Sequence, residues 1–290
     1  MIEQDKFYET FKFEIDLFIK KSLEEDIGNG DYTTKSCLQS PEKRKMILKV
    51  NQPCILAGVE LAKKIFSFYD SDIKIDINLT DGSSARIGEI GFIVSGKASS
   101  LLILERLVLN CMQRMSGIAT KTKTIKNLIT KFDVKILDTR KTTPSIRFLE
   151  KWAVKIGGGE NHRLGLFDMI MIKDNHIDFN KDLKTTINKA IQFKKQNNLN
   201  VKIIVEVRTI NDIIEILNLS GFDRIVLDNF NIEDTNEAVK LINKKYPIES
   251  SGGINEHNIL SYAKCGVNYI SIGDLTHSIQ NFDLSLTATK

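Results

Sequence analysis

The chain has 290 residues, of which 42% are hydrophobic and 27% are charged, with a formal charge of +4 and a sequence pI of about 8.7. This composition is that of an ordinary globular protein with a sizeable core, and no low-complexity segment is evident. The charge suits small acidic substrates, but it is too modest and too evenly spread to indicate nucleic acid binding.

The cysteines and the N-terminus indicate a cytoplasmic protein. Cys37, Cys54, Cys111 and Cys265 are far apart and form no CxxC pair. They are expected to be reduced, mostly packed thiols rather than a disulfide framework or a zinc site. No signal peptide is visible, and the most apolar region, Leu101–Leu109, is too short to span a bilayer. We therefore expect no membrane partner.

The first part of the chain mixes helices and strands. Apolar residues recur at helical spacing from Phe7, which predicts an amphipathic helix to about Glu25, ended by the glycine-containing segment 26–31. From Met46 to about Lys97 the pattern is strand-like, with alternation at 73–79 that is typical of a sheet with one solvated face.

Two further helices are predicted in this region. One covers Val59–Tyr69, and a long one without proline runs from Ser99 to about Lys131. Residues 1–112 are therefore interpreted as an α+β domain, with the long helix leading out of it.

Beyond residue 130, strands and helices alternate. Short β-rich runs lie at Lys135–Leu137, Met169–Ile172, Ile203–Val207, Arg224–Leu227, 248–250 and Tyr269–Ile272, with helical patterns such as Ile210–Leu217 and Ile232–Lys244 between them. Repeated strand–helix units with continuous apolar strands predict a parallel sheet covered by helices. Six strands are fewer than the eight of a complete barrel, so a smaller or open barrel fits.

Polar residues follow each predicted strand. They are Asp138 with Arg140 and Lys141, then Lys173, Glu206, Asp228, Ser251, and Gly273 with Asp274. Because the C-terminal ends of barrel strands meet at one mouth, these residues are expected to line one pocket.

Five cationic or imidazole side chains form a candidate anion site at that mouth: Arg140, Lys141, His162, Arg163 and Lys173. Arginine presents a planar fork to a carboxylate and lysine a movable charge, so a small polyanion is the natural partner. Two alternatives stay open at this point. Arg140 could pair with Asp138, and His162 could be a packed, hydrogen-bonded histidine.

Carboxylates and glycines complete the set. Glu206 and Asp228 end adjacent strands, where such acids hold magnesium together with substrate phosphates, although they could instead be structural acids beside lysines. The segment 251–253 (Ser-Gly-Gly) follows a strand, and a helix predicted to start near Asn255 would help to bind phosphate, with Gly273 as the second phosphate loop. A Schiff-base role for Lys173 is a weaker alternative.

The motifs at these positions resemble those of the quinolinate phosphoribosyltransferase (carboxylating nicotinate-nucleotide pyrophosphorylase) family over nearly the whole chain. The segments that carry the resemblance follow in the family's order and spacing: 25–34, 113–120, 138–144, 157–163, 173–176, 227–230, 251–254 and 271–278. Departures from the commonest pattern are Ser145 in place of glycine, Arg208 in place of an acid, and Asp274 in place of alanine.

The resemblance implies an α/β fold with an N-terminal α/β sandwich, residues 1–112 joined by the tail 276–290, and an open seven-stranded α/β barrel, residues 113–275. It also implies a homodimer in which Arg106 reaches the partner's barrel mouth. The implied enzyme transfers phosphoribosyl from phosphoribosyl pyrophosphate to quinolinate with decarboxylation in NAD biosynthesis, giving nicotinate mononucleotide, pyrophosphate and CO2.

The resemblance also implies residue roles. Lys141, Lys173, Glu206 and Asp228 are expected to be catalytic, with Glu206 and Asp228 holding Mg2+ partly through substrate. Substrate contacts are expected from Arg106, Thr139, Arg140, Lys141, His162, Arg163, Lys173, Glu206, Asp228, Ser251, Gly252, Gly253, Ile272 and Gly273.

Four other functions fit the sequence less well. A molybdenum-system relative of the same fold usually departs from the intact 157–163 and 173–176 motifs, and a nicotinate phosphoribosyltransferase acts on one carboxylate and would not need this many cations. A non-catalytic binding protein should have lost a cation or a metal-side acid. An RNA-binding role would call for a basic, aromatic-bearing face, and the chain has a single tryptophan, Trp152.

Overall fold

The computed structural model describes residues 6–38, 42–180 and 182–289, and the chain forms two compact units. Unit 1 comprises Met1–Lys123, Thr142–Gly158 and Leu275–Lys290, and unit 2 comprises Thr124–Lys141 and Gly159–Asp274. The tail 276–290 groups with the N-terminal residues, as in the predicted division, but residues 113–123 and 142–158 group there too and not with the barrel. The segment 142–158 belongs to unit 1 although both of its sequence neighbours belong to unit 2.

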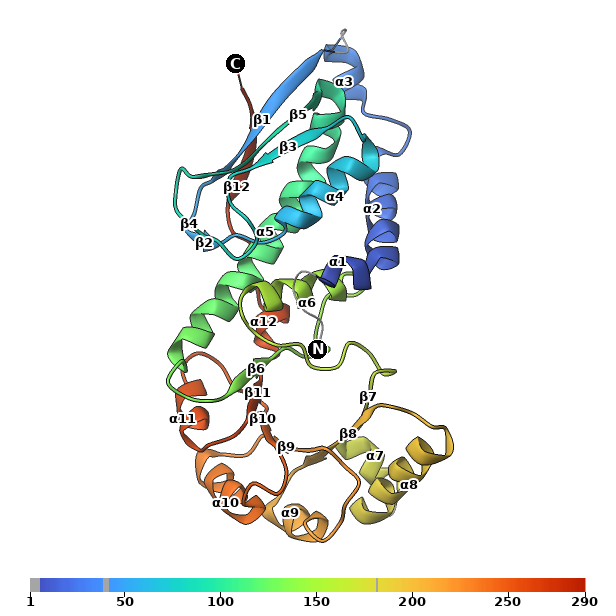
Figure 1. Cartoon of the computed structure of the whole chain (residues 1–290), viewed down its shortest axis with the longest axis vertical. Coiled ribbons are helices and arrows are strands. Elements are labelled where there is room, and N and C mark those ends of the chain that lie inside the picture. Colours follow the sequence, from blue (N-terminus) through green and yellow to red (C-terminus); the bar gives the residue numbers. More distant parts are fainter. Residues whose placement is uncertain (1–5, 39–41, 181, 290) are drawn as a thin grey trace. The chain divides into compact units, whose positions relative to one another are not determined.

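Unit 1 is built on an antiparallel sheet with strand order β12-β1-β5-β3 (Figure 1). Its strands are β1 (Lys43–Val50), β3 (Lys74–Ile77), β5 (Ile90–Lys97) and β12 (Leu284–Ala288), and β2 (Cys54–Ile55) pairs separately with β4 (Ser84–Ala85). Alternate residues of β1 are buried, namely Met46, Leu48 and Val50, which is the period expected when one sheet face covers the core. The predicted half-solvated sheet is therefore confirmed.

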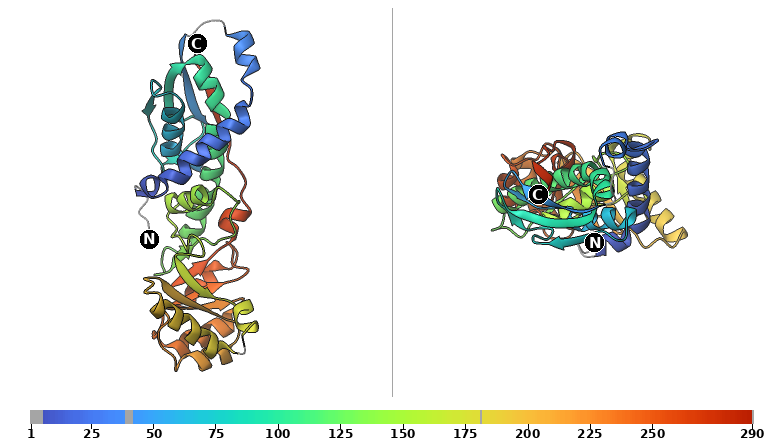
Figure 2. Two further views of the ribbon diagram at one scale, coloured as in Figure 1. Left: turned by 90° about the vertical axis from the view of Figure 1, so that its right-hand side faces the viewer. Right: turned by 90° about the horizontal axis from the view of Figure 1, so that it is seen from above.

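The helices of this region are α1 (Phe7–Thr10), α2 (Lys12–Ile27), α3 (Tyr32–Cys37), α4 (Val59–Tyr69), α5 (Ala98–Leu128), α6 (Arg147–Ile156) and α12 (Asp274–His277), seen from two further sides in Figure 2. The α4 bounds coincide with the prediction, and Phe66 of α4 meets Phe92 of β5 with ring centroids 6.1 Å apart. The predicted first helix is interrupted at Phe11 (φ −112°, ψ 24°), and α3 was not predicted.

Aromatic packing explains why the segment 142–158 belongs to unit 1. Trp152 of α6 stacks on Phe7 with ring centroids 5.6 Å apart, and Phe148 meets Phe11 and Phe18 at 6.4 and 5.9 Å. Buried aromatic pairs add to the energy of apolar burial. These contacts hold α6 against the N-terminal helices.

Unit 2 is a six-stranded parallel sheet with strand order β6-β11-β10-β9-β8-β7. Its strands are β6 (Lys135–Leu137), β7 (Met169–Ile172), β8 (Lys202–Val207), β9 (Arg224–Asp228), β10 (Ile248–Ser251) and β11 (Tyr269–Ser271), each within one residue of its predicted bounds. The helices α7 (Asp174–Asp178), α8 (Leu183–Gln196), α9 (Ile210–Ile216), α10 (Ile232–Ile242) and α11 (Ile259–Lys264) lie outside the ring of strands (Figure 1).

The barrel is open, and its seventh position is a bridge rather than a strand. β6 pairs with β11 on one side, and on the other Leu137 makes a single parallel bridge with Glu160. Three glycines precede Glu160, and Asn161 and the His162 backbone turn to Asp138, so the ladder stops after one residue. In the described residues the seven strands implied by the family resemblance are thus six strands and a bridge.

The cysteines agree with the prediction of packed thiols. Cys54, Cys111 and Cys265 are buried and Cys37 is exposed, and all four are free. Burial raises the pKa of the Cys54 thiol to about 11 and that of Cys111 to about 12. In the part of the chain that the structure describes, no helix has the length and hydropathy needed to cross a membrane.

Candidate active site

The residues predicted to form one site in unit 2 all lie at the C-terminal ends of its strands. Asp228 ends β9 and Ser251 ends β10, Lys173 directly follows β7, and Glu206 is the last residue but one of β8. The others follow β6, the Glu160 bridge and β11: Thr139, Arg140, Lys141, His162, Arg163, Ile272 and Gly273. Because the strands are parallel, these ends share one edge of the barrel.

The strand register shows which side chains share a face. Glu206 pairs with Val226, Val226 with Glu249, and Glu249 with Tyr269, so all four point to the same face of the sheet. Asp228 and Ser251 pair one pleat closer to the C-terminal edge.

Ile272 cannot offer its side chain to a ligand in this arrangement. Its side chain is buried (1% exposed) and its N–H donates to the carbonyl oxygen of Leu137 at 2.9 Å. The residue therefore joins β6 to the segment that follows β11, and only Gly273 beyond it reaches the predicted loop.

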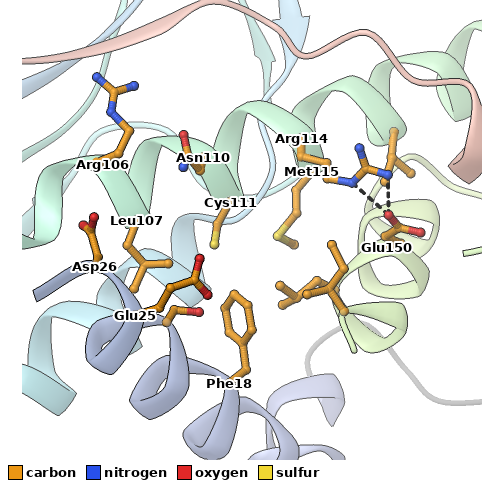
Figure 3. Close-up of a pocket in the computed structure, with 14 residues that line it drawn as sticks. Phe18, Glu25, Asp26, Arg106, Leu107, Asn110, Cys111, Arg114, Met115 and Glu150 are labelled. Carbon is orange, nitrogen blue, oxygen red and sulfur yellow. Dashed lines mark hydrogen bonds and ion pairs between the residues drawn. The ribbon is translucent and has the colours of Figure 1, made fainter. Parts of the chain in front are cut away.

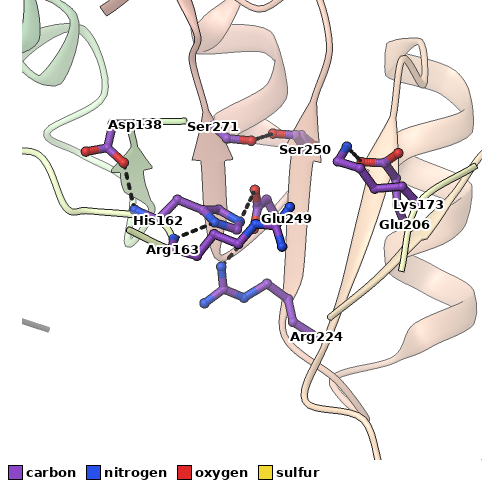
Figure 4. Close-up of polar contacts among 9 residues, drawn as sticks. All are labelled: Asp138, His162, Arg163, Lys173, Glu206, Arg224, Glu249, Ser250 and Ser271. Atoms are coloured by element: carbon purple, nitrogen blue, oxygen red, sulfur yellow. Dashed lines mark hydrogen bonds and ion pairs between the residues drawn. The ribbon is translucent and has the colours of Figure 1, made fainter. Parts of the chain in front are cut away.

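The closest contact among the predicted residues joins Lys173 to Glu206. Lys173 Nζ lies 2.5 Å from Glu206 Oε2, and the side chains are 41% and 4% exposed (Figure 4). Burial raises the pKa of Glu206, the bond from Lys173 lowers it, and the charge of Asp228 raises it. Lys173 Nζ therefore donates to an acid, and this engagement disfavours the Schiff-base alternative, since that reaction needs a free amine.

Glu206 and Asp228 fit the oxygen donors that magnesium uses. The two carboxylates lie on adjacent strands, and they are close enough that the charge of Asp228 raises the pKa of Glu206. In the described residues no group of three or more acidic, histidine or cysteine side chains could hold a metal alone. Magnesium commonly binds one or two carboxylates and completes its shell with water and substrate phosphates, so two acids are sufficient here.

A pair of arginines marks the anion-binding part of the site. Arg163 is buried (6% exposed), and its Nη1 donates to the carbonyl oxygen of Met169 at 3.3 Å. Burial lowers the pKa of Arg163 first, and the charge of Arg140 lowers it further, while Asp168 and Glu206 oppose both. An anion bound at Arg163 would offset this repulsion from Arg140.

His162 accepts a hydrogen bond at one ring nitrogen and approaches a buried carboxylate at the other. The N–H of Arg163 donates to His162 Nδ1 at 2.7 Å, and Nε2 lies 3.4 Å from Oε1 of Glu249, whose Oε2 accepts a bond from Arg224 Nη1 at 2.7 Å (Figure 4). The His162 side chain is 7% exposed and that of Glu249 is 1% exposed. Sequence reasoning missed Glu249 and Arg224, although a charged residue inside an apolar parallel strand was the available signal.

The partners of Glu249 fix its ionised form. Burial alone raises the pKa of Glu249, but the bond and charge of His162 and the charge and bond of Arg224 outweigh it and bring the pKa to about 2, from an ordinary value of 4.5. A carboxyl group whose pKa is lowered in the folded state stabilises the fold at pH values above its ordinary pKa. This stabilisation is lost as the pH falls from 4.5 to 2.

We expect the double substitution Glu249→Gln with Arg224→Met to flatten the acid side of the stability curve. The variant has no carboxylate at position 249 to take up a proton. Its free energy of unfolding should therefore fall by about 3 kcal/mol less than that of the wild type over this pH range. Denaturant unfolding at several pH values measures the difference. Parallel curves for the two proteins would contradict the assignment.

The loop after β10 is shaped for close backbone approach. Gly252 and Gly253 have φ of +95° and +61°, and a Cβ on Gly252 would lie 2.2 Å from Asn229 Oδ1. The Asn229 N–H donates to the Ser251 carbonyl oxygen at 2.8 Å, which ties together the segments that follow β9 and β10. Glycine is therefore required at 252, and space is left over 253, where nothing lies within 4 Å of an added Cβ.

The helix predicted to begin near Asn255 was placed wrongly. α11 begins at Ile259 and has six residues, because Asn255 and Asn258 form side-chain bonded turns instead. Asn258 Oδ1 accepts from the Asn255 N–H at 2.8 Å, and Asn255 Oδ1 accepts from the His257 N–H at 2.9 Å. The phosphate argument therefore depends on the glycine backbone and not on a helix dipole.

Arg106 lies in unit 1, on α5, at the rim of a pocket of about 300 Å³. Figure 3 shows the guanidinium of Arg106 pointing away from Asp26 and Glu25 of α2, with Arg114 bonded to Glu150 further along. Arg114 Nε donates to Glu150 Oε1 at 2.8 Å. The Arg106 side chain is exposed, and no carboxylate within 6–38, 42–180 or 182–289 forms an ion pair with it.

Comparison with known proteins agrees with this arrangement. The sequence profile for the quinolinate phosphoribosyl transferase N-terminal domain matches residues 31–116, and that for the C-terminal domain matches residues 118–287. The chain belongs to the quinolinate phosphoribosyltransferase family. It is 40% identical over 283 residues to quinolinate phosphoribosyltransferase [decarboxylating] 1 of Nicotiana glauca, covering 92% of this chain and 80% of the relative.

Other members of the family are also similar to the chain. A probable nicotinate-nucleotide pyrophosphorylase [carboxylating] of Methanocaldococcus jannaschii is 41% identical, covering 92% of this chain and 95% of the relative. The crystal structure of NadC from Streptococcus pyogenes superposes with a TM-score of 0.89 at 34% identity, covering 96% of this chain and 97% of that one. The predicted α/β fold and family are thus confirmed.

Two departures from the family pattern have visible structural effects. Ser145 has φ +67°, a left-handed conformation that costs a non-glycine residue about 1–2 kcal/mol. Arg208 donates from Nη2 to Asp178 Oδ1 at 2.8 Å, which ties the segment after β8 to α7.

Proposed function

We propose that this chain transfers the phosphoribosyl group of phosphoribosyl pyrophosphate to the ring nitrogen of quinolinate and releases pyrophosphate and CO2. The product is nicotinate mononucleotide, a precursor of NAD. The family match supports the reaction, and the observation that carries it in this chain is the pair Arg140 and Arg163 beside the Lys173–Glu206 contact. Three cations and two acids on one barrel edge suit a dicarboxylate next to a pyrophosphate.

Quinolinate would be held by the cationic side of the site. Arg140 and Arg163 can each present a fork to a carboxylate, and Lys173 supplies a point charge. His162 would support Arg163, whose N–H donates to His162 Nδ1. Lys141, exposed and with its N–H bonded to Thr139 Oγ1 at 3.0 Å, would lie between quinolinate and pyrophosphate.

The ribosyl donor would occupy the acidic and glycine side. Glu206 and Asp228 would bind the ribose hydroxyls and Mg2+, and the backbone of 251–253 with Gly273 would hold the 5′-phosphate. When bound, Mg2+ would neutralise charge on the departing pyrophosphate. The remaining work of the protein is to place the pyridine nitrogen in line with the ribosyl carbon, which develops positive charge as its bond to pyrophosphate lengthens.

Decarboxylation needs no further group from the protein. Once the ring nitrogen carries the ribosyl group, its positive charge stabilises the carbanion left when the adjacent carboxylate departs as CO2. A proton from water then adds to that carbon and gives nicotinate mononucleotide. Arg140, Arg163 and Lys173 would by then have fixed the ring orientation.

The assembly and location belong to the same proposal. We propose a homodimer in which the exposed Arg106 of one subunit completes the quinolinate site of the other. A cytoplasmic location is supported by four free thiols, three of them buried. No nucleic acid or membrane partner is proposed.

The division between the two sides predicts unequal effects for Asp228→Asn. The substitution should weaken magnesium-dependent binding of phosphoribosyl pyrophosphate about a hundredfold, because metal binding needs the carboxylate, and quinolinate binding less than threefold. Isothermal titration with each ligand measures both. Glu233→Gln, an exposed acid on α10, is the matched control. Equal losses for both ligands would contradict the division.

A turnover assay tests the reaction directly. Purified protein is given phosphoribosyl pyrophosphate and magnesium with quinolinate, nicotinate or nicotinamide as acceptor. We expect nicotinate mononucleotide and CO2 from quinolinate and no product from the other two. If the folded protein is inactive with quinolinate, quinolinate is not the substrate of the anion site. The molybdenum-system relative or the non-catalytic binding protein would then be the better interpretation.

A further inference from the structure

A buried ionic network lies in the barrel beneath the predicted site, and its charges are paired without any ligand. Arg224 begins β9 and Glu249 lies on β10, and Glu249 accepts the bond from Arg224 Nη1 at 2.7 Å. Arg224 also stacks over the Tyr269 ring, 3.8 Å from its centroid. Replacing a buried ion pair by apolar residues of similar volume is often neutral or stabilising, so stability alone does not explain this pair.

The network ends at His162, and its hydrogen bonds define the imidazole. His162 Nδ1 accepts from the Arg163 N–H, so we assign the ring proton to Nε2, which faces Glu249 Oε1. Arg224 pairs with Glu249, and the imidazole therefore lies between a backbone donor and a carboxylate.

The same short segment is held from its other side by Asp138. Asn161 Nδ2 donates to Asp138 Oδ2 at 2.6 Å, and the His162 N–H donates to Asp138 Oδ1 at 2.9 Å. Asp138 is itself fully buried. The backbone that carries Arg163 is thus fixed at two points, Asp138 before it and the His162–Glu249 pair beside it.

We propose that Glu249, whose charge is balanced by Arg224, is a positioning residue that acts through His162 to fix the backbone and guanidinium of Arg163 for a substrate carboxylate. His162 then serves as the connecting element and not as a direct carboxylate ligand. The inference rests on the proposed function, since it assigns Arg163 a carboxylate of quinolinate. It predicts that the network affects quinolinate binding and leaves the ribosyl donor side, at Glu206 and Asp228, unchanged.

Two double variants separate this role from the cost of burying charge. Both carry Arg224→Met, and they differ in Glu249→Gln, which keeps an acceptor for His162 Nε2–H, and Glu249→Leu, which does not. Replacing both members of a buried ion pair by uncharged residues is often neutral for folding. Thermal unfolding confirms that each variant is folded before kinetics are measured.

The leucine variant should raise the KM for quinolinate about tenfold, the value expected when one hydrogen bond that orders the site is lost. Its kcat and its KM for phosphoribosyl pyrophosphate should change less than twofold. The glutamine variant should stay within about threefold of the wild type for all three. Adding His162→Ala to the leucine variant should give no further loss beyond that of His162→Ala alone, because the residues act in series.

Four results would overturn the proposal: equal quinolinate KM values for the two double variants, an equal rise in both substrate KM values, losses that multiply with His162→Ala, or a nitrogen NMR spectrum that places the His162 ring proton on Nδ1. The NMR measurement needs no variant other than His162→Ala for assignment among the four histidines. A wild type that binds no quinolinate would refute the proposed function itself. A wild type that binds it while the leucine variant behaves identically would refute the positioning role alone.

Discussion

Lys173→Met is expected to lower kcat/KM for quinolinate about a thousandfold, corresponding to about 4 kcal/mol. The substitution removes a cation from the quinolinate side, and it also leaves the buried Glu206 carboxylate beside Asp228 without its ammonium at 2.5 Å. Truncating one partner of a buried charge pair commonly costs 2–5 kcal/mol. Steady-state kinetics of the purified variant measures the loss.

Two further proteins distinguish chemistry from folding in this experiment. Lys202→Met removes an exposed lysine at the opposite end of β8 and should leave kcat/KM within twofold of wild type. The double variant Lys173→Met with Glu206→Gln should regain thermal stability, because no unpaired carboxylate remains, without regaining turnover. If the activity of Lys173→Met is within tenfold of that of the wild type, the assignment of Lys173 to the active site is wrong.

The sequence predicted the barrel strands well because each is a short apolar run between turn residues. The Ile203–Val207 run became β8 with one more residue, and the Val59–Tyr69 helix was predicted to the residue because its apolar face repeats at helical spacing. Residues at strand ends could then be placed on one edge from the parallel topology alone. This is why Lys173, Glu206 and Asp228, far apart in the chain, could be assigned to one site.

Features that depend on contacts between distant segments were not predictable in the same way. α6 is stabilised by Trp152 stacking on Phe7, a partner that no local pattern shows. Glu249 and Arg224 are 25 residues apart, and their pairing depends on the register between β9 and β10. The start of α11 was misplaced because Asn255 and Asn258 bond to nearby backbone groups, and such side chains compete with helix formation.

Arg106→Ala is expected to abolish quinolinate turnover, by at least a thousandfold in kcat/KM, while the protein stays folded and dimeric. Arg106 is an exposed arginine on α5, far in sequence from the barrel residues, so folding should not depend on it. Its loss would remove one cation from the quinolinate site of the partner subunit. Arg86→Ala, another exposed arginine of unit 1, is the matched control and should keep full activity.

Mixing two inactive proteins tests whether the site is shared between subunits. In a hybrid of Arg106→Ala with Lys173→Ala, the barrel of the first subunit keeps Lys173 and receives Arg106 from the second, so one site is complete. Random exchange of equal amounts places half of the dimers in hybrids, and about a quarter of wild-type activity should return. The hybrid fraction is measured by native mass spectrometry of differently tagged chains. If hybrids form and no activity returns, Arg106 acts on the barrel of its own subunit, and the shared-site homodimer is wrong.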